Sequence, residues 1–242
     1  MKSKMKEVLE WQKAALKALA GRMDSFYLAG GTALSLLYFH HRESYDLDFF
    51  SQHYSLKEIA GAVNFLETQM RKKARKTVDS NGKKGFARMR RYEIPLGEGE
   101  PLKLDFVEDF VEILKPHKRI EGIDYASLDD IYLRKIYAAT GIITGKDALG
   151  RIKTQGKRQE ARDLFDLYHL STTYKRLTVF VKEFHEKLQI QIPAIIQWYH
   201  SLNKIEMSLG LGEIVTTNPV EFFEISRYFK KEIDDLMREA VG

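Results

Sequence analysis

The chain has 242 residues, 44% hydrophobic and 30% charged, which is ordinary for a globular protein long enough to bury a core. It contains no cysteine, which excludes disulfides, thiolate nucleophiles and Cys-ligated zinc and favours a reducing, cytoplasmic setting. No apolar run approaches the length needed to cross a membrane, and we expect neither a membrane span nor a signal peptide.

The net charge of +5 is distributed unevenly. Residues 71–91 contain ten Lys or Arg and one acid, a charge of about +9, so the rest of the chain sums to about −4. This basic window indicates a polyanionic partner or, equally, a solvated basic hairpin.

The spacing of apolar residues predicts alternating helices and strands in the first half. In chain order we expect a helix over residues 6–23 ending near Gly21, a short buried strand over 25–31, a helix over 32–41, a strand over 45–50, and an amphipathic helix over 55–70 with Ser55 and Glu58 at capping-box spacing.

A hairpin with an Asn81-Gly82 turn is predicted over residues 71–94, followed by a strand over 102–107. From Ser127 onward almost everything is predicted to be helical. The fold class is therefore α+β, with an α/β domain over residues 1–125 and a helical domain over 126–242.

Gly30-Gly31 separates a predicted strand from a predicted helix. Such a pair permits tight turning and close approach of a ligand, and the helix N-terminus that follows favours an anion such as a phosphate. By itself, a strand–Gly–Gly–helix segment is more often simply a turn.

Asp46 and Asp48 point to one face of their strand, because side chains on a strand alternate. Two carboxylates aimed together repel unless a cation lies between them, and a hard ion such as Mg²⁺ suits oxygen ligands. Asp105 interrupts an apolar strand that we expect beside the first, and it is the natural third acid. The alternative is a capping or ion-pairing role for each acid, with Lys103 as the partner of Asp105.

The sequence has Gly30-Gly31, then fourteen residues, then Asp46-x-Asp48. This spacing resembles the signature of the polymerase-β-like nucleotidyltransferase superfamily. The string "GGTAL…HRESYDLDFF" resembles, more narrowly, the AbiEii/AbiGii toxin family of minimal nucleotidyltransferases. The resemblance implies a short mixed sheet flanked by helices, followed by a C-terminal helical bundle that completes the active-site cleft.

The same resemblance assigns roles to single residues. It implies that the two glycines and an adjacent hydroxyl cradle the nucleotide phosphates, that three acids bind Mg²⁺ or Mn²⁺, and that Arg42-x-Ser44 contacts the phosphate tail. The positions are Gly30, Gly31, Thr32, Asp46, Asp48 and Asp105. Arg42 could equally be a structural partner of an aspartate.

Lys135 falls inside the apolar arc of a helix predicted to start after Ser127, so it needs an anionic partner. The family expects a lysine here that contacts nucleotide phosphates; a core-paired lysine is the alternative. The segment "RDLFDLYHL" resembles the last family motif, whose acid is important for activity. Asp163 and Asp166 are both candidates for that catalytic acid, and Arg162 can reach Asp166 at i,i+4. We expect Lys135 and these acids to face the same cleft as Gly30-Gly31.

His40, His41 and His53 lie near the site in the sequence, but imidazole is a poor Mg²⁺ ligand, so surface or supporting roles are expected.

The resemblance implies transfer of a nucleoside monophosphate from a nucleoside triphosphate, by a toxin of a bacterial toxin–antitoxin or phage-defence system with a cognate antitoxin. Phe86 and Tyr92, among the basic residues Lys83, Lys84, Arg88, Arg90 and Arg91, favour an RNA acceptor, and we expect tRNA modification at the 3′ end. The alternatives are a nucleotidyltransferase that modifies a protein or a small molecule, an antitoxin role, and a non-catalytic RNA-binding module.

Overall fold

The computed structural model describes residues 2–82, 87–96, 100–146, 152–188 and 192–241. The chain divides into two compact units, Met1–Leu36 with Ser44–Ser127 (unit 1) and Leu37–Glu43 with Leu128–Gly242 (unit 2). Unit 1 contains a mixed sheet with helices and unit 2 is mainly helical, so the α+β class expected from the sequence is confirmed.

Unit 1 is built on one twisted sheet whose strands, within the described residues, follow the order β3-β4-β5-β2-β1-β7-β6. Its strands are β1 (Tyr27–Leu28), β2 (Asp46–Ser51), β3 (Arg75–Asn81), β4 (Arg88–Ile94), β5 (Leu102–Glu108), β6 (Lys118–Ile120) and β7 (Ile123–Tyr125). Its helices are α1 (Lys2–Leu19), α2 (Gly30–Ala33) and α3 (Leu56–Met70); a π-helical turn, η1 (Leu34–Phe39), leads out of α2 into unit 2.

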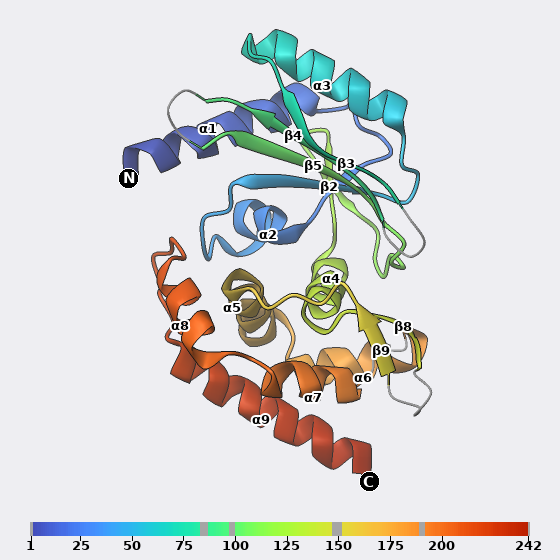
Figure 1. Cartoon of the computed structure of the whole chain (residues 1–242), viewed down its shortest axis with the longest axis vertical. Helices are drawn as coiled ribbons and strands as arrows, with labels where there is room; N and C mark the ends of the chain where they lie inside the picture. Colours follow the sequence, from blue (N-terminus) through green and yellow to red (C-terminus); the bar gives the residue numbers. More distant parts are fainter. Residues whose placement is uncertain (1, 83–86, 97–99, 147–151, 189–191, 242) are drawn as a thin grey trace. The chain divides into compact units, whose positions relative to one another are not determined.

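One face of this sheet is covered by α1 and α3, which lie side by side, and α2 lies on the other face (Figure 1). The covered face is apolar: Leu47 and Phe49 of β2 alternate with the acids of that strand and pack with Phe106 of β5, all buried. The rings of Phe49 and Phe106 stack with centroids 5.6 Å apart. The opposite face is therefore left for polar side chains.

The cap of α3 follows the predicted capping box only in part. The Ser55 hydroxyl accepts the Glu58 N–H (3.2 Å), as the spacing predicts. The Glu58 carboxylate reaches instead to the N–H of Ser25 (3.0 Å), which ties the helix to the chain entering β1.

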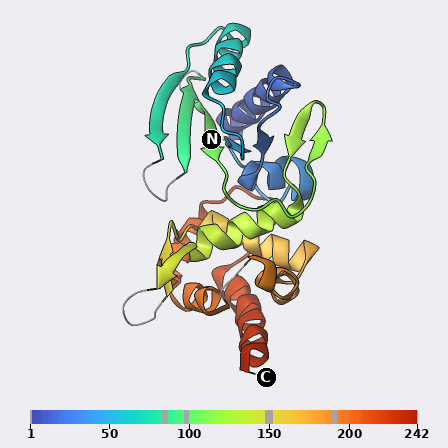
Figure 2. The ribbon, with the colours of Figure 1, turned by 90° about the vertical axis from the view of Figure 1, so that its right-hand side faces the viewer.

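Unit 2 packs its helices around a core that includes the fully buried Tyr132, Phe165, Phe180 and Phe229. Its elements are α4 (Leu128–Thr140), β8 (Ile142–Lys146), β9 (Ile152–Gln155), α5 (Ala161–His169), the π-helical turn η2 (Leu170–Tyr174), α6 (Leu177–Leu188), α7 (Ile192–His200), α8 (Lys204–Gly212) and α9 (Phe222–Val241). Figure 2 shows the β8–β9 hairpin following directly on α4. In the described part of the chain, no helix is long and apolar enough to cross a membrane.

The β6–β7 and β8–β9 hairpins were not predicted. Glu121 and Gly122 both have positive φ (48° and 79°), a tight turn that needs no Asn-Gly or Asp-Gly signal. Gly141 (φ 80°) ends α4, after which the β-branched Ile142 and Ile143 enter β8, so the prediction of an almost purely helical second half is wrong there.

The helix predicted over residues 32–41 begins two residues earlier, at Gly30, and is less regular than expected. Only Gly30–Ala33 is α-helical, and the chain then follows the π-helical turn to Phe39 and a left-handed His40 (φ 50°). The π-helical turn carries the chain out of unit 1, because Leu37–Glu43 belongs to unit 2.

Candidate active site

Two neighbouring strands of unit 1 carry the three predicted acids. β5 lies parallel to β2, with Asp48 opposite Asp105 and Asp46 opposite Lys103, so the expected pairing of these strands is present. Adjacent strands lie about 4.8 Å apart, which places the Asp48 and Asp105 side chains next to each other on one face. The Asp105 side chain is 5% exposed and that of Asp46 is 27% exposed.

Gly30 lies directly against Asp48. A Cβ at this position would lie 2.7 Å from Oδ2 of Asp48, and the backbone has φ +68°, which side-chain-bearing residues rarely adopt. The N–H of Ala29 donates to the Asp48 carbonyl (3.0 Å) and fixes this approach. The first glycine is thus needed both for the turn and for the space of the carboxylate.

Thr32 and Ser44 are buried and bonded to each other. The Thr32 hydroxyl lies 2.8 Å from the Ser44 hydroxyl and also hydrogen-bonds the backbone carbonyl of Asp46. In this arrangement the two hydroxyls tie α2 to the start of β2. Gly31, the remaining residue of unit 1 that the sequence analysis assigns to the site, is buried in α2.

Two basic side chains lie against the acids. Arg91 on β4 stands opposite Asp105 and donates to both of its carboxylate oxygens, from Nε (2.7 Å) and Nη2 (2.6 Å). The amine of Lys103 lies 3.9 Å from Asp46. The pKa of Arg91 is raised by its hydrogen bonds to Asp105 and, further, by the charges of Asp46 and Asp48, against the opposing effect of burial.

The sequence predicts Arg91 at a nucleic-acid surface and, as the alternative to a metal site, Lys103 as the partner of Asp105. The structure corrects both: Arg91 neutralises Asp105 and Lys103 lies beside Asp46. The hairpin register decides this, and the sequence pattern does not encode it.

The acids fit a divalent cation by their chemistry. Three carboxylates on one sheet face supply the hard oxygen ligands that Mg²⁺ and Mn²⁺ prefer, and Gly30 leaves open the space that a Cβ would fill beside Asp48. In the described residues no group of three His, Asp or Glu side chains already has the arrangement of a metal site. Arg91 and Lys103 supply positive charge to the acids.

Unit 2 contains a second charged cluster, in which Asp166 is completely buried. It accepts from Nε (2.6 Å) and Nη2 (2.8 Å) of Arg42, lies 2.7 Å from Nε2 of His41, and is 2.6 Å from Nζ of Lys135. Burial opposes its ionisation, but Lys135 and Arg42 hold the pKa of Asp166 well below its ordinary value.

Lys135 bridges the two candidate acids of α5. Its amine is 2.6 Å from Asp163 as well as 2.6 Å from Asp166, and Asp163 is also bonded by Nε of Arg158 (2.5 Å). Burial alone would lower the pKa of Lys135, yet the two carboxylates raise it. The sequence prediction that this buried lysine has an anionic partner is confirmed. For Arg42 the sequence analysis left open a contact to the phosphate tail or a structural pairing with one of the aspartates, and its guanidinium is paired with Asp166.

Two features of this cluster differ from the sequence analysis. Arg162 pairs with Glu160 (3.2 Å) rather than with Asp166. The sequence analysis also missed Arg158 as the partner of Asp163. His41 is buried against Asp166, which agrees with the supporting role that was one of the two expected for it. That the cluster shares a cleft with Gly30-Gly31 stays a prediction.

The basic window between residues 71 and 91 is largely ion-paired. Lys83, Lys84 and Phe86 lie outside the described residues, and Tyr92 packs edge-on against Phe106. The pairs are Lys73–Glu67, Arg75–Glu93, Lys76–Asp79, Arg90–Asp79, Arg88–Glu108 and Arg91–Asp105. The surplus of free positive charge is therefore smaller than the sequence indicates.

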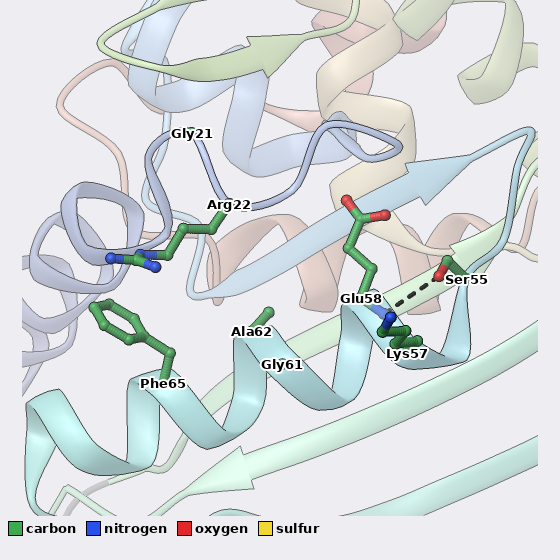
Figure 3. A pocket seen from close by; sticks show the side chains of 8 residues that line it. All are labelled: Gly21, Arg22, Ser55, Lys57, Glu58, Gly61, Ala62 and Phe65. Atoms are coloured by element: carbon green, nitrogen blue, oxygen red, sulfur yellow. Dashed lines mark hydrogen bonds between the residues drawn. The ribbon is translucent and has the colours of Figure 1, made fainter.

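A pocket of about 540 Å³ lies elsewhere in unit 1, between the loop after α1 and the first turns of α3 (Figure 3). Its Arg22 guanidinium lies 3.7 Å from the centroid of the Phe65 ring, and its Glu58 accepts the N–H of Ser25. The pocket includes none of the predicted site residues, and we assign it no role.

Comparison with solved structures gives the fold. JHP933 from Helicobacter pylori matches with a TM-score of 0.51 and 20% identity over 96% of this chain and 94% of that one. A putative nucleotidyltransferase from H. pylori matches with a TM-score of 0.53 and 16% identity over 93% and 95%. MenT4, a nucleotidyltransferase toxin from Mycobacterium tuberculosis, matches with a TM-score of 0.53 and 14% identity over 93% and 82%.

A search among curated proteins gave no match. The family model of the nucleotidyl transferase AbiEii toxin, of type IV toxin–antitoxin systems, matches residues 14–184. This span contains every residue that the sequence analysis singled out for the site. The chain belongs to the AbiEii family of nucleotidyltransferase toxins.

Proposed function

We propose that the protein transfers a nucleoside monophosphate from a nucleoside triphosphate to a hydroxyl of an acceptor, and that Asp46, Asp48 and Asp105 lie at the reacting phosphate. In this reaction an acceptor oxygen attacks the α-phosphorus, the bond to the bridging oxygen breaks, and pyrophosphate leaves. The observation that carries the proposal is the placement of the three acids on one sheet face beside Gly30.

The proposed roles in unit 1 follow from chemistry and position. Asp46, Asp48 and Asp105 would hold Mg²⁺ or Mn²⁺, which when bound supplies Lewis-acid stabilisation of charge on the phosphoryl oxygens. Once Arg91 no longer bonds the Asp105 carboxylate, this carboxylate accepts the proton of the acceptor hydroxyl. Gly30 and Gly31 let the phosphates approach the backbone, and Thr32 and Ser44 support that turn.

The proposed roles in unit 2 rest on charge. Counting Arg42, Lys135 and Arg158 against Asp163 and Asp166, the cluster keeps one positive charge, which favours an anionic ligand such as a triphosphate. Within it, Asp166 is fully buried and orients Arg42 and Lys135, and Asp163, also buried, pairs with Lys135 and Arg158.

Substitution of Asp48 tests the chemistry. Asp48→Ala should abolish transfer of label from an α-³²P-labelled nucleoside triphosphate to total cell RNA or protein, because one of the three acids is lost. Its thermal stability should equal or slightly exceed that of the wild type, because repulsion among the acids falls. Full transfer activity in Asp48→Ala would refute the site assignment.

An RNA acceptor, most specifically a tRNA 3′ end, is the finer part of the proposal. Its support is the edge strand β3 and the segment before it, where Lys73, Arg75 and Lys76 are 90%, 77% and 42% exposed. Their ion pairs are weak at such exposure, so RNA phosphates can replace the carboxylates. Basic side chains that only protect a sheet edge are the alternative.

Salt-dependent binding of tRNA separates these possibilities. Replacement of Lys73, Arg75 and Lys76 by Gln should make the dependence of log affinity on log salt clearly shallower, by roughly one unit per lost phosphate contact. The matched control replaces Lys230, Lys231 and Arg238 on α9, of which Lys230 and Arg238 also form exposed ion pairs. If the dependence of log affinity on log salt is the same in both variants, a protein or small-molecule acceptor is favoured.

A toxin acting in phage defence together with a cognate antitoxin completes the proposal, and family membership supports it. Induced expression of the wild type should arrest growth of the host cell and expression of Asp48→Ala should not. Arrest by both proteins would point to binding without catalysis.

A further inference from the structure

Arg91 binds Asp105, the acid proposed both to hold the metal and to accept the proton of the acceptor. Both oxygens of Asp105 are bonded by its guanidinium, at 2.7 Å and 2.6 Å, in a fork that only arginine provides. The Arg91 side chain is 32% exposed whereas that of Asp105 is 5% exposed, so the arginine lies on the solvent side of the buried acid.

Arg90, which precedes Arg91 on β4, pairs with a different acid. Because side chains alternate along β4, Arg90 projects from the other face, where its Nε donates to Asp79 (2.9 Å) on β3. Arg90 and Arg91 are thus adjacent arginines, each paired with one aspartate, and only Arg91 is coupled to the acids of β2 and β5.

The charge balance explains what Arg91 does for the site. Three carboxylates on one face repel one another, and Arg91 and Lys103 reduce their formal charge from −3 to −1. The hydrogen bonds to Asp105 and the charges of Asp46 and Asp48 all raise the pKa of Arg91, so the guanidinium interacts electrostatically with all three acids.

We propose that Arg91 is a built-in competitor of the divalent metal, which holds Asp105 when no metal is bound and thereby sets the metal affinity of the free protein. Each oxygen of Asp105 already accepts one N–H of Arg91, so a metal held by Asp105 would have to share this carboxylate with the guanidinium or displace it. The metal also brings two positive charges close to the guanidinium. This inference rests on the proposed function, because the same three acids are the metal ligands.

The test is binding of Mn²⁺ alone, followed by the electron paramagnetic resonance signal of free Mn²⁺, without nucleotide or acceptor. Arg91→Gln should bind Mn²⁺ at least about tenfold more tightly than the wild type, which corresponds to about 1.4 kcal/mol. Arg90→Gln is the matched control and should bind like the wild type. Arg91→Lys keeps the charge but loses the fork, and it should bind about threefold more tightly than the wild type.

Thermal unfolding supplies an independent measurement. In EDTA, Arg91→Gln should melt below the wild type, because the repulsion among the three acids is no longer balanced. Added Mn²⁺ should then raise its melting temperature more than that of the wild type.

The outcomes distinguish this inference from the proposed function. If Asp48→Asn loses Mn²⁺ binding while Arg91→Gln binds no more tightly than the wild type, the competitor role is wrong and the metal site stands. If neither the wild type nor any variant binds Mn²⁺, both are overturned. Should Arg91→Gln fail to fold, Arg91→Lys decides, and wild-type affinity in that variant rejects the inference.

Discussion

Removal of the Lys135 charge should destabilise unit 2 strongly. The amine lies 2.6 Å from both Asp163 and Asp166, and the exposed fractions of the three side chains are 8%, 4% and 0%. Removing one partner of a buried ion pair costs about 3–5 kcal/mol, because an uncompensated charge stays buried. Both acids keep another basic partner, so we expect about 3 kcal/mol for Lys135→Met.

The assay uses the two tryptophans of the chain, Trp11 in unit 1 and Trp198 in unit 2. In a Trp11→Phe background the fluorescence of the buried Trp198 reports unfolding of unit 2 by urea, and linear extrapolation gives its free energy of unfolding. Lys230→Met is the matched control, because its ion pair with Asp234 is exposed and should contribute little to stability.

A second substitution tests the cause. Lys135→Met combined with Asp163→Asn removes one of the two carboxylates left without their lysine. The double variant should therefore be more stable than the sum of the single effects by about 1 kcal/mol or more. If Lys135→Met costs no more than Lys230→Met, or if the two substitutions simply add, the cluster does not stabilise unit 2 and the reasoning fails.

The remaining predictions concern the glycine turn and the pH dependence. Gly30→Ala should abolish nucleotidyl transfer and cost about 1–2 kcal/mol, because φ is +68° and the new methyl group would lie 2.7 Å from Oδ2 of Asp48. Gly61→Ala is its control: nothing lies within 4 Å of that Cβ in α3, so urea unfolding should show about 0.5–1 kcal/mol of added stability and unchanged transfer. Burial and the neighbouring His41 lower the pKa of His169 to about 4. The unfolded chain therefore binds more protons than the folded one, and stability should fall as the pH drops from about 6.5 to 4. His169→Phe should flatten that dependence in urea titrations at several pH values, and an unchanged slope would show that other groups cause it.

Local sequence patterns predicted the part of the candidate site that lies in unit 1. Alternation along "YDLDFF" placed Asp46 and Asp48 on the polar face, with Leu47 and Phe49 in the core, because a strand has a side-chain period of two. Gly30 could be recognised because a turn of positive φ favours glycine over residues with a side chain. These features depend on neighbours within a few residues, and they also carried the family resemblance.

The tertiary structure alone decided which charges meet. Arg91 and Asp105 are on adjacent strands of one sheet, and a shift of a single residue in register would have turned Arg90 toward Asp105 instead. Arg42 and Asp166 are separated by 124 positions, and nothing in either local pattern selects the other. A periodic pattern shows which face of an element is buried, but a buried charge takes its partner from whichever element packs against it, and that choice belongs to the whole fold.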